Sequence, residues 1–134
     1  MNKFVKNQIT YWLKSAAFDL PVADSLYAKN HFSWCLFIGH LVVEKVLKAI
    51  YVRDNNKVPP KTHNLIRLAQ STTLNFTEEK MIQLDRINDF NMEARYPDDK
   101  LSFYKICSEE FTKENLEIIK EMYNWLKSQI QLPT

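Results

Sequence analysis

The chain of 134 residues has one glycine and five prolines, and its 18 basic and 16 acidic side chains leave a formal net charge of +2. Tight hairpins, β-bulges and turns with positive φ depend on glycine, so the composition excludes a mainly β fold. It also excludes dinucleotide- and phosphate-binding loops, which need several glycines at fixed spacing. With 46% hydrophobic and 25% charged residues, the chain fits one soluble helical domain over residues 1–134.

The first half of the chain shows helical spacing of apolar residues. This spacing predicts helices over about 7–29 and 32–53. Pro21 falls inside the first, where a missing amide donor predicts a kink or a break. The second helix is apolar nearly all round its first half, which is typical of a helix that is central in a bundle or buried in a partner.

The second half is divided by turn and capping signals. The Pro59-Pro60 pair ends the preceding turn, and the residue before Pro97 is expected to resist helix. The predicted segments are a short helix over 64–71 capped by Thr62 or Asn64, a helix from the Thr77 cap to Arg95 or Tyr96, a loop over 97–107, and a helix from the Ser108 cap to Ile130. The fold class is therefore all-α, an antiparallel up-and-down bundle of four long helices and one short one.

Charge and cysteine usage bear on the surroundings of the protein. Residues 44–67 carry six basic and two acidic side chains, whereas residues 78–121 carry twelve acidic and seven basic ones, so one end is expected to be basic. Cys35 lies in an apolar run and reads as a buried free thiol. No apolar leader precedes residue 12, and the run over 34–43 is too short to span a bilayer. We expect a cytoplasmic protein without membrane contact.

The sequence offers neither a complete set of metal ligands nor a cysteine nucleophile with an oriented base. His40 and Glu44 share a helix face, but a metal site needs three or four ligands and no second ligand pair is visible. Cys35 with His31 or His40 would form a Cys–His pair on one helix, without a third group to orient the base. No metal and no cofactor are expected.

Two polar constellations remain, and each has two interpretations. Arg95, Tyr96 and Asp98, around Pro97, can bind a phosphate and stack on a base. Alternatively, they can form a helix end in which Arg95 complements the last carbonyls and pairs with Asp98. The second constellation is the only continuous polar line of its helix, at positions i, i+4 and i+8, formed by His40, Glu44 and Lys48. It can face a cleft or a dimer seam, or it can be a solvated edge with a Glu–Lys pair.

The single glycine lies at a core position of the second helix. Gly39 costs about 1 kcal/mol against alanine in a helix, so a close approach of another helix explains it. We predict that Gly39 lies where this helix meets a neighbour, within the bundle or across a dimer.

Four short motifs in order carry a resemblance to a known family. They are A-x-D-L at 17–20, E-K-x-L-K-A at 44–49, H-x-L at 63–65 and A-R-Y-P at 94–97. With these four motifs in this order, the chain resembles the HEPN domain family (higher eukaryotes and prokaryotes nucleotide-binding). The resemblance implies a prokaryotic, cytoplasmic helical bundle that dimerises and is often encoded beside a minimal nucleotidyltransferase, commonly as a toxin–antitoxin pair. It also implies, for many members, a metal-independent ribonuclease with an Arg-x(4–6)-His motif.

That ribonuclease motif is missing here. The only histidine after any arginine is His63, which follows Arg53 with nine residues between them. Without the motif no imidazole is in the expected place to move the proton of a 2′-hydroxyl. We therefore expect a non-catalytic, dimeric partner of a nucleotidyltransferase that binds a nucleotide or RNA, without recognising DNA sequence.

Roles follow for the candidate residues. Arg95 would contact phosphate and Tyr96 would stack or orient beside Asp98. The dimer cleft would be lined by Lys48, Glu44 and His40. The alternatives are a metal-independent ribonuclease that uses His40 or His63 as base, and a purely structural dimerisation module.

Overall fold

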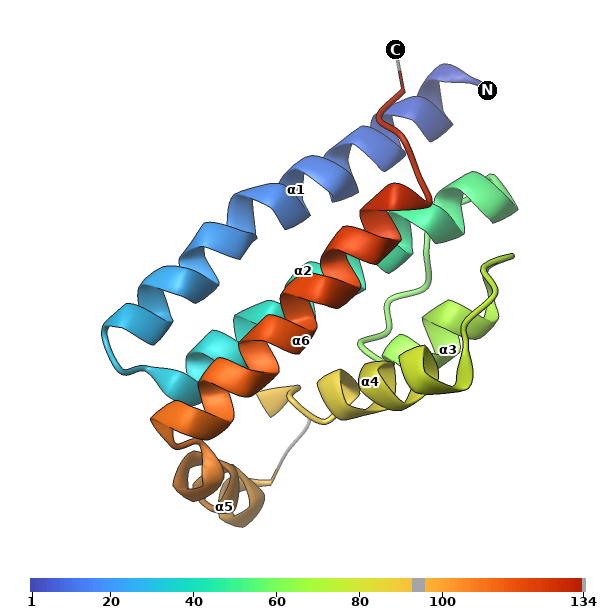
Figure 1. Cartoon of the computed structure of the whole chain (residues 1–134). Coiled ribbons are helices and arrows are strands. Elements are labelled where there is room, and N and C mark those ends of the chain that lie inside the picture. The colour runs from blue at the N-terminus through green and yellow to red at the C-terminus, as the bar shows by residue number, and fades with distance from the viewer. Residues whose placement is uncertain (93–95, 134) are drawn as a thin grey trace.

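The computed structural model describes residues 1–92 and 96–133, and the described part contains helices and no strands. The helices are α1 (Lys3–Ala28), α2 (Phe32–Asn55), α3 (Leu65–Gln70), α4 (Glu78–Asn88), α5 (Pro97–Ile106) and α6 (Glu109–Ser128). Figure 1 shows α1, α2 and α6 running side by side, with α3 and α4 on the far side from α1. The all-α bundle predicted from the sequence is confirmed, with six helices in place of five.

Of the kink or break expected at Pro21, the break is wrong, because helix α1 continues through Pro21, and the kink stays a prediction. Proline removes one backbone donor, which in a regular helix would bond the carbonyl of Ala17. Both Ala17 and Pro21 are exposed, so water can reach that carbonyl and the loss is tolerated. The helix begins at Lys3, because the side chain of Asn2 accepts a hydrogen bond of 2.8 Å from the amide of Val5.

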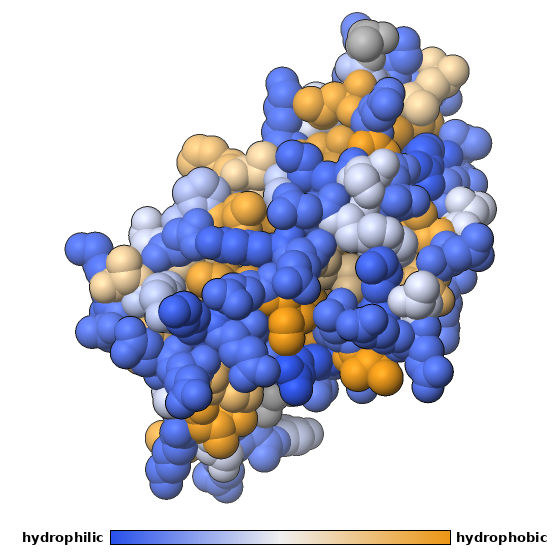
Figure 2. All heavy atoms as spheres, viewed as in Figure 1, coloured by the Kyte–Doolittle hydropathy of each residue, from blue (hydrophilic) through white to orange (hydrophobic). Residues whose placement is uncertain are grey.

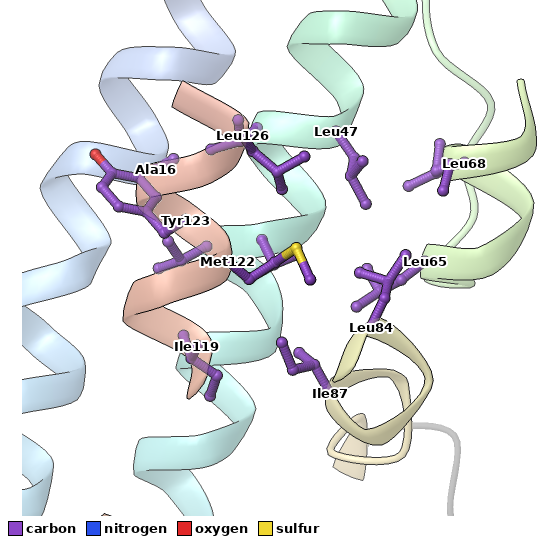
Figure 3. Close-up of a cluster of buried hydrophobic side chains, with 14 of the residues drawn as sticks. Ala16, Leu47, Leu65, Leu68, Leu84, Ile87, Ile119, Met122, Tyr123 and Leu126 are labelled. Carbon is purple, nitrogen blue, oxygen red and sulfur yellow. The ribbon is translucent and has the colours of Figure 1, made fainter. Parts of the chain in front are cut away.

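Helix α2 forms the centre of the bundle and packs against α1, α3, α4 and α6. This explains why its first half is apolar nearly all round. Figure 3 shows its Leu47 among core side chains of three other helices, which are Leu65, Leu68, Leu84, Ile87, Ile119, Met122 and Leu126. Gly39 is buried where α2 meets α6, and a Cβ added there would lie 2.5 Å from Cδ1 of Ile119. The glycine therefore allows the two helices to approach closely.

The prediction of a loop over 97–107 is wrong, because Pro97–Ile106 form helix α5. Pro97 occupies the first turn of α5, where its fixed φ is already helical and its missing donor is not needed. Asp98 and Asp99 in the same turn favour the positive end of the helix dipole. The preceding helix, expected to reach Arg95 or Tyr96, ends at Asn88. Pro97 therefore marks the start of a helix and not the end that the sequence predicts.

The capping signals placed the other helix starts correctly. The side chains of Asn64, Thr77 and Ser108 accept hydrogen bonds from backbone amides at the starts of α3, α4 and α6. Among the helices in the described part of the chain, none is both long and apolar enough to cross a membrane. The surface in Figure 2 is mainly hydrophilic, with apolar side chains in small separate groups.

Candidate functional site

The polar line of α2 is buried. His40, Glu44 and Lys48 are 0, 3 and 7% exposed, respectively. Together with His63 from the segment before α3, they form what we call the α2 polar cluster. The prediction that this line is a solvated helix edge is wrong, because His63 of the segment before α3 and Trp12 of α1 contact it, whereas the Glu44–Lys48 pair predicted with it is confirmed.

Glu44 is the centre of the cluster, since each of its carboxylate oxygens has a different partner. Lys48 Nζ donates to Oε2 at 3.1 Å, and His63 Nδ1 lies 2.8 Å from Oε1. On its other side Lys48 Nζ lies 5.1 Å from the centroid of the Trp12 ring of α1. The carboxylate and the ring face together compensate the ammonium group for its lost water.

His63 is held at two points. Its ring nitrogen Nδ1 pairs with Glu44, and its backbone carbonyl, 3.1 Å from Nε2 of His40, accepts a hydrogen bond from that ring. Because a carbonyl only accepts, His40 carries its proton on Nε2. Likewise, in neutral His63 the carboxylate of Glu44 selects the proton on Nδ1, which leaves a lone pair on Nε2. The side chain of His63 is 51% exposed.

His40 is a structural member of the cluster. Burial lowers its pKa from 6.5 to about 4, although Glu44 and the hydrogen bond to His63 act in the opposite direction. Its Nδ1 is buried and has no hydrogen-bond partner within residues 1–92 and 96–133. A neutral, fully covered imidazole holds the loop but does not itself touch a ligand.

An open hollow of about 610 Å³ lies in front of His63. Its walls come from the segment before α3 and from the segment that follows α4, and they are lined by Lys61, Thr62, His63, Asn64, Asn88, Asp89 and Asn91. The two walls are joined by a hydrogen bond of 2.9 Å from the amide of Leu65 to Oδ1 of Asn88. The lining supplies one lysine, one aspartate, one histidine and three asparagine side chains, so it can bind a polar ligand, with Lys61 as its cationic group.

The other predicted site residues lie on α5. Tyr96 is 80% exposed at the N-cap position of α5, and Asp98 is exposed in the first turn. In the described part of the chain, no hydrogen bond or ion pair joins either residue to the α2 polar cluster. Arg95 lies outside the described residues.

Sequence reasoning missed two members of this arrangement. Trp12 was read only as part of the apolar stripe of its helix, and His63 was not connected to Glu44. The H-x-L motif directly after a Pro-Pro turn was the available signal for His63, since it places a histidine where the chain returns to α2.

Neither a metal centre nor a reactive thiol is supported by the geometry. Within the described ranges, no group of three or more His, Cys, Asp or Glu side chains is close enough to hold a metal ion. Burial, aided by Asp24, raises the pKa of the Cys35 thiol to about 12. The thiol is therefore a neutral core group.

Comparisons with known proteins agree with this architecture. The bundle is similar to the crystal structure of TT1696 from Thermus thermophilus, with a TM-score of 0.80 and 16% identity over 92% of this chain and 99% of the other. It is also similar to ST0689, an archaeal HEPN homologue, with a TM-score of 0.64 and 18% identity over 92% and 98% of the two chains. None of the curated proteins matches the chain.

These two likenesses show a shared helical fold. The HEPN domain matches residues 9–129, and the chain belongs to the HEPN domain family.

Proposed function

We propose that this HEPN protein binds a nucleotide, free or within RNA, in the hollow in front of His63. The observation that carries the proposal is the hollow itself, with Lys61 and the clamped His63 on its wall. The protein would act as a non-catalytic, homodimeric partner of a minimal nucleotidyltransferase in a two-gene toxin–antitoxin-like system. The family membership supports that setting.

The lining has the groups that a nucleotide needs. Lys61 supplies a cation for phosphate. The side-chain oxygens of Asn64 and Asn88 are occupied by backbone amides at the start of α3, so their amide nitrogens are left as donors to a base or a sugar. His63 adds a ring nitrogen at the same wall.

The α2 polar cluster acts in this proposal through His63. His40, Glu44 and Lys48 are too deeply buried to contact the ligand, but they fix the position of the His63 ring and backbone. Arg95 and Tyr96 would reach the ligand from the segment that follows Asn91, with Arg95 on phosphate and Tyr96 stacked on the base beside Asp98.

Lys61→Ala is expected to weaken ATP binding about tenfold, because a hydrogen bond to a charged group contributes about 1.5–3 kcal/mol. Isothermal titration calorimetry of the purified protein with ATP and with uridine monophosphate measures the effect. The matched control is Lys57→Ala, which removes an exposed lysine of the same segment that does not line the hollow. Equal losses in both variants, or no heat and no thermal shift with either nucleotide at millimolar concentration, would refute the hollow as the site.

A second function, metal-independent cleavage of RNA, is favoured by the Glu44–His63 pair. Glu44 orients His63 so that Nε2 carries a lone pair, as in a histidine–carboxylate general base. Nε2 would take the proton of a 2′-hydroxyl, whose oxygen attacks the neighbouring phosphorus. The bond from phosphorus to the 5′-oxygen then breaks, which yields a cyclic phosphate and, after protonation by water, a 5′-hydroxyl end.

If this reaction occurs, single-stranded RNA should be cleaved in the presence of EDTA, and His63→Gln should reduce the rate by at least about 100-fold, as expected for a lost general base. Gel analysis of the fragments provides the measurement. His31→Gln, at an exposed histidine before α2, should leave the rate unchanged. Intact RNA after prolonged incubation with the wild-type protein would leave binding as the function.

A further inference from the structure

Helix α1 has an exposed face that is largely open to solvent in the described structure. Its Tyr11 ring makes an edge contact with the Trp12 ring of the same helix, and Lys14 borders a hollow shared with Tyr123 and Lys127 of α6. The inner side of α1 is formed by buried residues such as Ile9 and Ala16, and Figure 1 shows the helix at one edge of the bundle. The opposite side, which we call the α1 outer face, follows helical spacings of three and four through the exposed residues Phe4, Asn7, Tyr11, Lys14, Phe18 and Val22.

Three aromatic rings stand on this face at equal intervals. Phe4, Tyr11 and Phe18 are 50, 59 and 77% exposed and follow one another every seven residues. On a helix this spacing places successive rings about 10 Å apart along one line. Solvent-exposed aromatic side chains in such an ordered row mark an interaction surface.

The charge around the rings is positive. Lys3, Lys14 and Lys29 are exposed and form no ion pair within the described residues. The two acids of α1 are neutralised by other helices, since Asp19 pairs with Lys45 at 2.5 Å and Asp24 pairs with Lys120 at 2.6 Å. An anionic partner would therefore meet free lysines and no free carboxylate on this helix.

Aromatic and polar side chains alternate along the α1 outer face, and this alternation favours one kind of partner over another. Asn7 and Lys14 each lie between two aromatic residues, so the face is not a continuous apolar seam of the kind that a packed helix requires. A second copy docked on this face would bring two sets of unpaired lysines together. A single strand of nucleic acid fits better, because unpaired bases stack on aromatic rings while the backbone phosphates contact lysines.

We propose that single-stranded nucleic acid binds along the α1 outer face, with bases stacked on Tyr11 and Phe18 and a phosphate on Lys14. Lys14 is three residues after Tyr11 and four before Phe18, so it neighbours both rings along the helix, at the edge of the face that borders α6. The hollow is lined by residues next to α3 and α4, and Figure 1 shows these helices on the far side of the bundle from α1. The α1 outer face is therefore a separate surface, and its test does not depend on the proposed function.

The test is fluorescence anisotropy with a labelled twelve-nucleotide oligouridylate. Tyr11→Ala and Phe18→Ala should each weaken binding by at least about fivefold, the lower end of the effect of removing a stacking ring. Lys14→Gln should reduce the slope of log affinity against log salt by about 0.7, as expected for one lost phosphate contact with a single strand. A blunt duplex of equal length should bind more weakly, since its bases are not free to stack.

The control is Ile82→Ala, which removes an apolar side chain that is 64% exposed on α4. It should leave the anisotropy curve unchanged. ATP binding measured with the same Phe18→Ala protein should also be unchanged, whereas Lys61→Ala tests the hollow alone.

The proposal is overturned if the wild-type protein does not bind the oligonucleotide, or if Phe18→Ala binds as well as the wild type. Sedimentation velocity adds a separate check. A dimer that becomes a monomer in Phe18→Ala without loss of oligonucleotide affinity would assign the α1 outer face to self-association instead.

Discussion

Lys48→Met is expected to lower the free energy of unfolding by about 3 kcal/mol, because removing one partner of a buried ion pair leaves the other charge uncompensated. Glu44 is 3% exposed and would keep only His63 as a partner. The ammonium group of Lys48 is equally dependent on Glu44, since its other neighbour is the ring of Trp12. Urea denaturation followed by circular dichroism measures the loss.

The double variant Glu44→Gln/Lys48→Met should recover most of this stability. A pair of neutral side chains removes the desolvation cost of both charges, so the double variant is expected within about 1 kcal/mol of the wild type. Lys120→Met provides the matched control, because the Lys120–Asp24 pair is exposed, with side chains 40 and 50% accessible, and such pairs contribute about 1 kcal/mol or less. Equal losses in the free energy of unfolding for Lys48→Met and Lys120→Met would show that the buried Glu44–Lys48 pair contributes no more to stability than an exposed pair.

At the α2 polar cluster, the sequence could predict which residues share a helix face but not that they are buried. The spacing of His40, Glu44 and Lys48 placed them on one side of a helix, and this was sufficient to predict that they act together. It could not reveal their burial, because that depends on α1 and on the segment over 59–64, which lie against α2 only in the folded chain. His63 approaches Glu44 across 19 residues, a contact that helical spacing within α2 does not encode, and the H-x-L motif after the Pro-Pro turn marks the histidine without naming its partner.

The same distinction holds for the helices. Side-chain caps are local signals, so Asn64, Thr77 and Ser108 marked the starts of three helices correctly. Proline is ambiguous, because the same ring ends one helix and begins the next. At Pro97 the two acids that follow favoured a start, and at Pro21 the outcome depended on whether water could reach the freed carbonyl.

Stability is expected to fall as the pH decreases from 6.5 to 4, in part because of His40. Burial lowers the pKa of His40 in the folded chain to about 4 from an ordinary value of 6.5. Below 6.5 the unfolded chain binds a proton that the folded chain resists, so protonation favours unfolding. The contribution is complete above pH 6.5 and is lost as the pH approaches the folded pKa. The difference between the two pKa values corresponds to about 3 kcal/mol.

His40→Gln isolates this contribution, because an amide nitrogen can still donate to the carbonyl of His63 but does not titrate. The groups around His40 that carry charge are Glu44, Lys48 and His63, and all three remain in the variant. The free energy of unfolding of His40→Gln, measured by urea denaturation at intervals between pH 4 and 7, should therefore decrease less steeply than that of the wild type. His31→Gln should follow the wild-type curve, since His31 is exposed. Parallel curves for the wild type and His40→Gln would mean that His40 is protonated without disturbing the fold.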